Sequence, residues 1–345
     1  MPKGVSMSAV QSLVAEDEAA YAQLARTALA LWDLRHIDLQ LIKIRENAVY
    51  LVSCEGGRKA ILRVHRHGYH SDAALHSENA WTCALAEAGL RVPRAIASRR
   101  GQPFERVQAK GVQGERQVDV IEWIEGRQLG SVEAGVAGDD AHITRQYDIL
   151  GQTAARMHQQ ASQWQPGPGF VRHSWCAQGL AGEQPLWGRF WELDALDDAQ
   201  RRLLVTTRHA LLHDLNALPR DVHTFGLIHA DLVPENLLAH GDDVHVIDFD
   251  DAGFGWHLFD IATSLYFLLP QPCFETAKRA LIDGYRKVRP LSDEDAARLP
   301  MFLAARGTTY LGWVHERKNT QTARELTPFL VELACTAAQH YLRGH

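Results

Sequence analysis

Two neighbouring stretches decide the fold of this chain: LIHADLVPENLL at residues 227–238 and VHVIDFDD at residues 244–251. Each contains a short apolar run typical of a buried strand, and the Gly-Asp-Asp between them, at residues 241–243, is a strong turn signal. The spacing predicts a tight hairpin centred on the middle residue of this turn. In an unbulged hairpin of that kind, Asn236 and Asp248 face each other with their Cα atoms about 4.5 to 5.5 Å apart.

The side chains in and before this hairpin suit phosphoryl transfer. Mg²⁺ prefers oxygen ligands and usually combines one or two carboxylates with waters and substrate phosphates. Asn236 and Asp248 are therefore predicted metal ligands. Asp231 lies on the loop that leads into the first strand, and it can accept the proton of an attacking hydroxyl. Phosphoryl transfer needs little else from a protein than neutralised phosphate oxygens and a positioned nucleophile.

Charge and composition exclude several other classes of protein. The chain has 345 residues, 46% hydrophobic and 23% charged, as in folded globular proteins, and this length favours two lobes with a cleft between them. Lys and Arg number 36 against 42 Asp and Glu, a net charge of −6, so nucleic acid is not an expected partner. No segment is apolar enough for a membrane span or a targeting peptide, so we expect a cytoplasmic protein without a membrane partner. The five cysteines lack a C-x-x-C spacing and are expected to be free thiols.

Apolar periodicity predicts a small antiparallel β-rich lobe followed by a larger helical one. We expect strands at residues 39–44, 48–54, 59–64 and 118–124, and helices at residues 16–32 and 72–88. Beyond about residue 141 the pattern is mainly helical. The predicted fold class is α+β, with an N-terminal lobe at residues 1–125 and a C-terminal lobe at residues 126–345.

The motifs resemble those of a known superfamily. His229, Asp231 and Asn236 reproduce the H-x-D-x-x-x-x-N spacing of kinase catalytic loops, and the Asp-Phe-Asp at residues 248–250 stands where kinases carry D-F-G. Over roughly residues 35 to 340 the order of motifs resembles the aminoglycoside phosphotransferase and choline kinase superfamily, most closely its homoserine kinase type II branch. The resemblance implies a bilobal protein-kinase-like fold and an ATP-dependent kinase with an alcohol group as acceptor. It also implies ATP, or GTP in its place, and Mg²⁺ as cofactors.

The resemblance implies roles for residues of the C-terminal lobe. Asp231 would be the catalytic base, and His229 would brace the catalytic loop from behind. Asn236 and Asp248 would bind the magnesium ion. Asp260 is expected to anchor the loop through backbone N–H groups.

The resemblance places nucleotide binding in the N-terminal lobe. Arg63 stands where the kinase strand carries its phosphate-contacting Lys, and Glu78 on the next helix would be its ion-pair partner. Glu122 and Ile124 would present backbone groups to the purine, and the turn that ends at Asn47 would cover the phosphates.

Two features depart from the family. No G-x-G-x-x-G precedes the second strand, and an arginine, which can clasp phosphate oxygens at two points, replaces the lysine.

A small molecule is the expected acceptor. The interval from Asp248 to Asp260 is short and lacks the A-P-E motif and the long phosphorylatable segment with which protein kinases hold peptides. The resemblance points to the hydroxyl of an amino alcohol, an amino acid such as homoserine, or an aminoglycoside-like sugar. Asp250 and Asp251 could approach the metal, be solvated, or hold the turn that follows. Candidate acceptor-pocket residues in the helical lobe are Trp313, His315, Glu316 and Arg317, and packing of this helix is an equal alternative for them.

Other functions stay open on the sequence alone. A Ser/Thr protein kinase of the stress-response type would keep the phosphotransfer and change the acceptor. A metal-dependent phosphohydrolase built on His229, Asp231, Asp248 and Asp250 would give no role to the N-terminal strands. A nucleotide-binding scaffold would not need Asp231. The sequence does not name the acceptor, the choice between ATP and GTP, or the oligomeric state.

Overall fold

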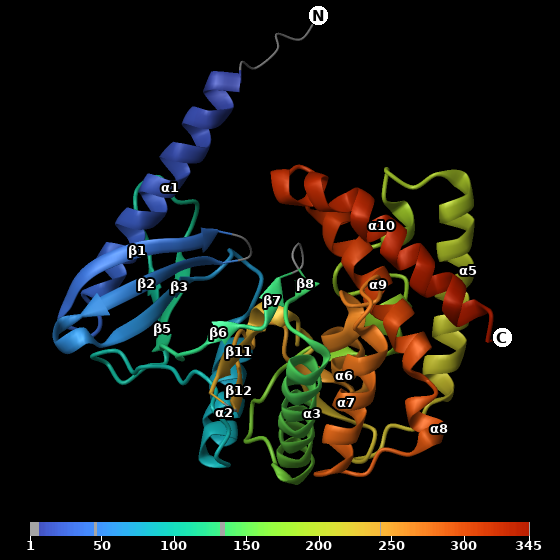
Figure 1. Ribbon diagram of the computed structural model, residues 1–345. Coiled ribbons are helices and arrows are strands. Elements are labelled where there is room, and N and C mark those ends of the chain that lie inside the picture. The colour runs from blue at the N-terminus through green and yellow to red at the C-terminus, as the bar shows by residue number, and fades with distance from the viewer. Residues whose placement is uncertain (1–6, 45–46, 132–134, 242, 345) are drawn as a thin grey trace, which may run out of the picture. The chain divides into compact units, whose positions relative to one another are not determined.

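The computed structural model describes residues 7–44, 47–131, 135–241 and 243–344, with side chains from residue 18 onward. The chain divides into two compact units (Figure 1). Unit 1 consists of Met1–Ala86, Val92–Ile124 and Pro166–Val171, and unit 2 consists of Glu87–Arg91, Glu125–Gln165 and Arg172–His345. The passage between residues 124 and 125 lies one residue before the predicted lobe boundary.

Unit 1 is built on a five-stranded antiparallel sheet with the strand order β1-β2-β3-β5-β4. Its strands are β1 (His36–Ile44), β2 (Ala48–Cys54), β3 (Lys59–Val64), β4 (Phe104–Val107) and β5 (Arg116–Glu122), and its helices are α1 (Met7–Leu29) and α2 (Asp72–Glu87). The predicted meander, the later strand and both helices are confirmed, whereas the short β4 was not predicted.

The core of unit 1 is shared by the sheet and α1. Tyr50 and Val52 of β2 are buried, and their neighbours in the strand are half-buried, so alternate residues face the core. They pack in one apolar cluster with Leu24 and Ala28 of α1 and Val120 of β5. The apolar side chains that recur every second residue in the strands therefore pack against the apolar face of α1.

Unit 2 is mainly helical, as predicted. Its helices are α3 (Asp140–Gln163), α4 (Ala177–Ala181), α5 (Asp198–Ala217), α6 (His257–Tyr266), α7 (Phe274–Arg286), α8 (Asp293–Ala296), α9 (Leu299–Glu316) and α10 (Gln321–Leu342). Its strands are short: β6 (Arg127–Gln128), β7 (Gly130–Ser131), β8 (Gly135–Val136), β9 (Ser174–Trp175), β10 (Phe225–Ile228), β11 (Leu237–His240), β12 (Asp243–Val246) and β13 (Gly253–Trp256). They form sheets of order β12-β11-β6, β10-β13-β9 and β7-β8. The predicted α+β class is confirmed.

The predicted hairpin forms between β11 and β12, but its register differs from the prediction. Two residues connect the strands, so the ladder is centred before Asp242 and not on it, and Asp242 itself lies outside the described residues. Asn236 consequently stands opposite Ile247, whose N–H donates to the Asn236 carbonyl at 3.0 Å. The predicted pairing of Asn236 with Asp248 is wrong by one residue, because two-residue turns match the twist of hairpin strands and close the ladder earlier.

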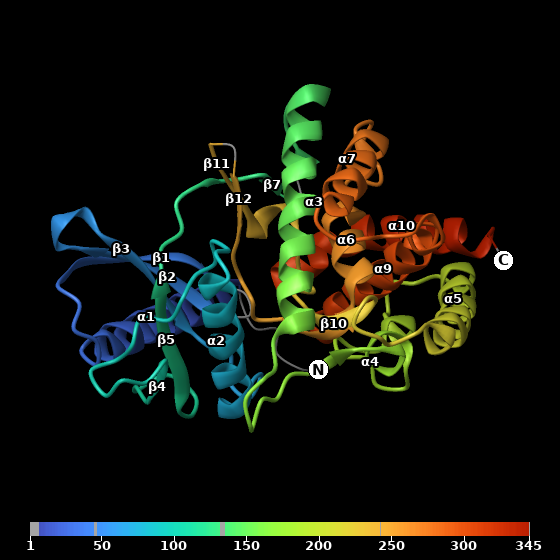
Figure 2. The same ribbon diagram turned by 90° about the horizontal axis from the view of Figure 1, so that it is seen from below.

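Two glycines let α3 and α7 lie in close contact, and both views show the helices side by side (Figures 1 and 2). A Cβ at Gly151 would lie 2.1 Å from the Leu281 carbonyl oxygen, and a Cβ at Gly284 would lie 2.0 Å from the Asp148 carbonyl oxygen. Any larger side chain at either position would push the helices apart. The close approach brings polar side chains of both helices near Asp260 of α6.

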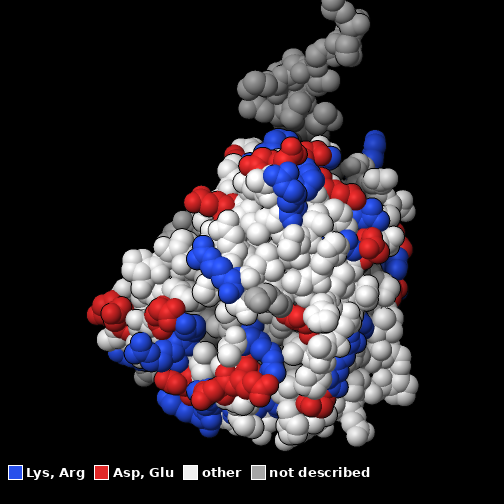
Figure 3. Space-filling model, turned by 90° about the vertical axis from the view of Figure 1, so that its right-hand side faces the viewer, with Lys and Arg blue, Asp and Glu red and all other residues white. Residues whose placement is uncertain are grey.

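Three further findings concern the thiols, the surface and the length of the helices. All five cysteines are free thiols, as predicted. On the face shown in Figure 3, acidic and basic side chains are interspersed around an area without charge. Within the described ranges, no helix combines the length and the apolar character needed to span a bilayer.

Candidate active site

The loop between β10 and β11 is held by a buried carboxylate of α6. Asp260 is fully buried; its Oδ1 accepts from the N–H of Ala230 at 2.6 Å, and its Oδ2 accepts from the N–H of His229 at 2.9 Å. Ala230 has a φ of 66°, in the left-handed region, which costs an L-residue about 1–2 kcal/mol. The two hydrogen bonds offset this cost. Asp260 thus anchors the loop through backbone N–H groups, as the sequence predicted.

His158 of α3 and Tyr285 of α7 support Asp260 in turn. His158 Nε2 lies 3.0 Å from Asp260 Oδ2, and His158 Nδ1 lies 3.0 Å from the Tyr285 hydroxyl. Burial, reinforced by Arg289, lowers the pKa of His158 to about 3, so the ring is neutral at pH 7 and donates one N–H to Asp260. Burial raises the pKa of Asp260, while His229 and the loop N–H groups oppose that rise.

His229 connects the catalytic loop to the strand that precedes Asp248. Its Nε2 donates to the Ile247 carbonyl at 3.0 Å, and its Nδ1 accepts from the Asp231 N–H at 3.2 Å. This pattern requires a neutral ring, and burial lowers the pKa of His229. The ring also packs edge-on against Phe249, with 4.6 Å between centroids. The structure therefore places His229 behind the loop, where it fixes Asp231 relative to the end of β12.

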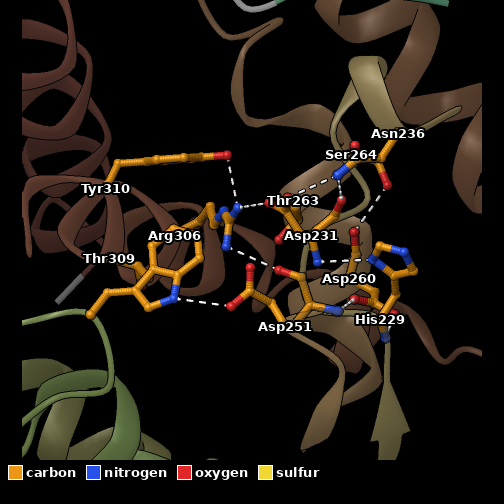
Figure 4. A network of polar contacts seen from close by, with 12 residues as sticks. His229, Asp231, Asn236, Asp251, Asp260, Thr263, Ser264, Arg306, Thr309 and Tyr310 are labelled. Atoms are coloured by element: carbon orange, nitrogen blue, oxygen red, sulfur yellow. Dashed lines mark hydrogen bonds and ion pairs between the residues drawn. The ribbon is translucent and has the colours of Figure 1, made fainter. Parts of the chain in front are cut away.

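Asp231 and Asn236 point toward each other (Figure 4). Asn236 Nδ2 donates to Asp231 Oδ2 at 2.9 Å and to the Asp231 carbonyl at 3.0 Å. Because its amide nitrogen serves Asp231, the amide oxygen is the atom that Asn236 can offer to a cation. Asp248 has a φ of 69°, and a non-glycine residue held in this region is typical of functional sites. The two side chains supply hard oxygen donors, and this donor set fits Mg²⁺.

Arg306 of α9 contacts the loop from another side, and the sequence analysis missed it. Its side chain is fully buried; Nη1 donates to the Ala230 carbonyl at 3.0 Å, and Nη2 forms an ion pair with Asp231 Oδ1. Nη2 also donates to the Tyr310 hydroxyl at 2.7 Å. Burial alone would lower the pKa of Arg306, but Tyr310 and Asp231 raise it overall, so the guanidinium is charged. A single basic residue in the otherwise apolar stretch MFLAARGTTYLGW was the signal that could have found it.

The turn after Asp248 points one carboxylate toward the same region. Asp251 Oδ1 accepts from Trp187 Nε1 at 3.3 Å. Arg172 fixes this turn by donating to the carbonyls of Asp250, at 2.5 Å, and of two neighbouring residues. The Asp251 side chain therefore lies against Trp187, and the approach of Asp251 to the metal stays a prediction.

The predicted acceptor helix does reach Asp231, but through a residue that precedes the predicted ones. Arg306 makes the contact, two to three turns of α9 before the predicted set at residues 313–317, and Tyr310 contacts Arg306. Trp313 and Arg317 stack on each other instead, with 4.9 Å from the guanidinium to the ring centroid.

Unit 1 brings Arg63 together with Glu78, as predicted, and adds a second carboxylate. Arg63 Nη2 lies 2.9 Å from Glu78 Oε1 and 2.5 Å from Asp119 Oδ2, and Arg63 Nε donates to Asp119 Oδ1 at 3.0 Å. Arg63 and Asp119 are register partners on β3 and β5, and His65 Nε2 lies 3.1 Å from Asp119 Oδ2. Although burial favours the neutral acid, Arg63 and His65 hold the pKa of Asp119 well below its usual value.

The other predicted nucleotide-binding residues also belong to unit 1. The Asn47 side chain accepts from the Arg66 N–H at 3.1 Å, which ties the β1–β2 turn to the end of β3. The other two residues of that turn, at positions 45 and 46, lie outside the described residues. Glu122 ends β5, and its N–H donates to the Arg94 carbonyl at 2.9 Å. Ile124 is buried two residues later.

Comparisons with known proteins agree with this geometry. A structure of a microcompartment-associated aminopropanol kinase is similar, with a TM-score of 0.81 and 28% sequence identity. The superposed region covers 94% of this chain and 98% of the chain of that kinase. An amicoumacin kinase in complex with AMP-PNP, Ca²⁺ and Ami has a TM-score of 0.72 and covers 97% of this chain and 96% of its own; at 23% identity it shows the fold alone. A homoserine kinase of Beijerinckia indica subsp. indica is 30% identical over 231 residues, 65% of this chain and 62% of that protein.

These likenesses confirm the protein-kinase-like fold and the superfamily that the motifs indicated. The model of the phosphotransferase enzyme family (APH) matches residues 38–299, which is well over half of the chain. The residues from β1 to the start of α9 thus carry one family signature. The chain belongs to the phosphotransferase enzyme family, and the protein is a phosphotransferase.

Proposed function

We propose that this enzyme transfers the γ-phosphoryl group of ATP, with Mg²⁺, to a hydroxyl group of a small molecule. The arrangement around Asp231 carries the proposal: its side chain is 20% exposed, and Asn236 and Arg306 each hold one of its oxygens. An acceptor hydroxyl that reaches this carboxylate gives it a proton while the hydroxyl oxygen bonds to the γ-phosphorus and ADP leaves.

The metal and the loop have separate tasks in this proposal. Asn236 and Asp248 would hold Mg²⁺, which neutralises phosphate oxygens when bound. His229 keeps Asp231 at a fixed place relative to the end of β12, and Asp260 keeps the left-handed loop in shape. Positioning of this kind supplies much of the rate in phosphoryl transfer.

We assign nucleotide binding to the N-terminal lobe, residues 1–125, and transfer and acceptor binding to residues 126–345. Arg63, held in place by Glu78 and Asp119, would contact the phosphates through its guanidinium. The N–H of Glu122 is already bonded within unit 1, so the purine would meet the Glu122 carbonyl and the backbone of Ile124. Asn47 would fix the turn that covers the phosphates.

The acceptor is proposed to be an amino alcohol, an amino acid such as homoserine, or an aminoglycoside-like sugar. The names of the relatives support this range, since they include an aminopropanol kinase and a homoserine kinase. The Asp251 carboxylate beside Trp187 favours acceptors that carry a protonated amine, which a carboxylate attracts.

A screen of ADP release tests the proposal directly. The protein is incubated with MgATP and, in turn, 1-amino-2-propanol, L-homoserine, kanamycin and myelin basic protein. We expect acceptor-dependent ADP release with a small amine-bearing alcohol. Release with the protein substrate alone would favour the Ser/Thr protein kinase, and ADP release that no acceptor stimulates would favour hydrolysis.

Variants of the site sharpen the test. Asp231→Asn should lower kcat by about 10²–10⁴-fold and leave nucleotide affinity nearly unchanged, because a base is lost and no phosphate contact is removed. Asp248→Ala should instead weaken MgATP binding itself. Asp243→Asn, an exposed acid of β12, serves as the matched control and should behave as the unmodified protein. Full turnover in Asp231→Asn would disprove the assigned role.

A further inference from the structure

Arg306 is a fully buried arginine whose ion-pair partner is the proposed catalytic carboxylate. We propose that Arg306 is a positioning residue of the transfer reaction, which fixes Asp231 through the carboxylate oxygen that Asn236 does not use. The inference rests on the proposed role of Asp231 and adds a residue that the family motifs do not contain.

The contacts of Asp231 show how the fixation works. Asn236 Nδ2 donates to Oδ2 at 2.9 Å, and Arg306 Nη2 pairs with Oδ1. A carboxylate held at both oxygens cannot rotate about its Cβ–Cγ bond without losing one partner. Arg306 Nη1 also donates at 3.0 Å to the carbonyl of Ala230, the residue with left-handed backbone. One guanidinium therefore fixes the side chain of the base and the backbone that precedes it.

Aromatic rings in turn hold the guanidinium of Arg306. Its central carbon lies 4.3 Å from the Tyr310 ring centroid, 4.9 Å from that of Trp187 and 5.7 Å from that of Phe259. Figure 4 shows Arg306 between Tyr310 and Asp231. Rings at these distances stabilise a cation, so the cage that could attract an external ammonium is filled by the protein's own charge. The planar fork also reaches three acceptors at once, which the single nitrogen of a lysine cannot do in the same geometry.

Stability alone does not explain a charge at this position. Replacing a buried ion pair with apolar residues of similar volume is often neutral or stabilising, so a fold does not require such a pair for its own sake. Unit 2 contains a second buried arginine that makes the comparison possible. Arg208 stacks at 4.0 Å on Trp191 and donates to the Ala181 carbonyl at 2.9 Å and to Glu183 at 2.6 Å. It resembles Arg306 in stacking on a ring and in having one carbonyl and one carboxylate partner. It differs in that its carboxylate partner, Glu183, is 82% exposed and is not part of the site.

Steady-state kinetics of matched variants test the proposal. The full-length protein is assayed with MgATP and whichever of 1-amino-2-propanol, L-homoserine and kanamycin it turns over fastest. Arg306→Met should lower kcat by about 100-fold and change KM for the acceptor by less than about threefold, because a misplaced base costs rate and not binding. Arg306→Lys should recover about tenfold of that loss by restoring one contact to Asp231. Arg208→Met should stay within about threefold of the unmodified protein.

A milder variant covers the case in which Arg306→Met unfolds. Tyr310→Phe keeps the charge and the ring and removes only the hydroxyl that Nη2 reaches at 2.7 Å. It should lower kcat by about two- to fivefold at an unchanged melting temperature. Equal losses in the Arg306 and Arg208 variants, or a fall in melting temperature that accounts for the lost activity, would overturn the positioning role.

Crystal structures of the Arg306→Met and Tyr310→Phe variants separate this inference from the proposed function. The Asp231 carboxylate should leave its 2.9 Å contact with Asn236 in the Arg306→Met variant and keep that contact in the Tyr310→Phe variant. An Asp231 that stays in place without Arg306 would overturn the inference. If the unmodified protein turned over none of the acceptors, the proposed function would fail, and the displacement of Asp231 would still decide whether Arg306 positions it.

Discussion

At the scale of single residues, Arg63 of unit 1 forms a buried ion-pair cluster with Glu78 and Asp119. The side chains of Arg63, Glu78 and Asp119 are 9%, 6% and 8% exposed. Charged side chains that are buried to this extent stabilise one another, because the loss of one partner leaves a buried charge without an opposite charge. The exposed pair of Arg94 and Glu122, at 54% and 38%, lies in the same unit and has no such dependence.

This contrast gives a prediction for stability. Arg63→Met should lower the free energy of unfolding by about 3–5 kcal/mol, since two buried carboxylates lose their cation. Arg94→Met should cost less than about 1 kcal/mol, because water already solvates both partners. Urea denaturation followed by circular dichroism measures both values. Similar losses in the two variants would contradict the assignment of a strongly coupled cluster around Arg63.

Local sequence identified several site residues and missed others for a physical reason. Asp231 and Asn236 belong to one loop, so their spacing was visible in the sequence. Arg306 lies 75 residues from Asp231, and Asp119 lies 56 residues from Arg63. Only the packing of α9 and the pairing of β3 with β5 show which carboxylate Arg306 meets and which cation Asp119 meets.

At the scale of elements, the catalytic loop depends on α6, α3 and α7 together. Asp260 on α6 holds two loop N–H groups, and His158 and Tyr285 hold Asp260 from the other helices. Ala230 would not keep its left-handed backbone unaided. The shape of the loop is therefore set by side chains 30 residues or more away from it.

Asp260→Asn tests this dependence. An amide presents at least one N–H where the carboxylate accepts a hydrogen bond, so we expect a loss of about 3 kcal/mol in stability and a fall in kcat. Asp214→Asn on α5 removes a charge that accepts from the Tyr341 hydroxyl at 2.6 Å, and it should cost about 1 kcal/mol or less. Differential scanning calorimetry and the ADP-release assay provide the two readouts. An Asp260→Asn variant with normal stability and turnover would show that the loop holds its own shape.

The elements themselves were predictable where period and turn chemistry agree. Strands β1, β2, β3 and β5 and helices α1 and α2 followed from alternation and from helical spacing. Strand β4 was missed because two of its four residues, Phe-Glu-Arg-Val, are charged, so the sequence shows no apolar run. Glu105 pairs with Arg100, and Arg106 pairs with Asp72 of α2. The hairpin was predicted with the wrong centre, since Gly-Asp-Asp is compatible with more than one turn length.

At the scale of the whole molecule, buried histidines link stability to pH. Burial lowers the pKa of His158 to about 3, and burial lowers the pKa of His229 and of His257 as well. In the unfolded chain these groups titrate near 6.5. Between pH 6.5 and the lower folded-state values, the unfolded chain binds more protons than the folded chain, so the free energy of unfolding falls as pH falls. The raised pKa of Asp260 acts in the opposite direction, in a window just above pH 3.8.

The predicted size is up to about 1.4 kcal/mol per pH unit for each histidine. Urea denaturation at pH 7.0 and pH 5.5 should show a clear loss of stability at the lower pH. His257→Gln should make the dependence shallower, because one titrating group is removed, and His213→Gln, which alters an exposed ring, should leave it unchanged. A free energy of unfolding that is the same at both pH values would contradict the prediction.

The interleaving of the two units limits how the molecule can be dissected. The chain has already entered unit 2 when Pro166–Val171 returns to unit 1, where the N–H of Val171 donates to the Ser77 hydroxyl at 2.8 Å. A gene fragment that stops at residue 125 would lack the segment Pro166–Val171. A fragment that starts at residue 126 would contain this segment without Ser77, to which it is bonded. Isolated halves for spectroscopy or crystallisation therefore have to be built as grafts, with the six-residue return joined to the front half by a linker, because no single cut separates them.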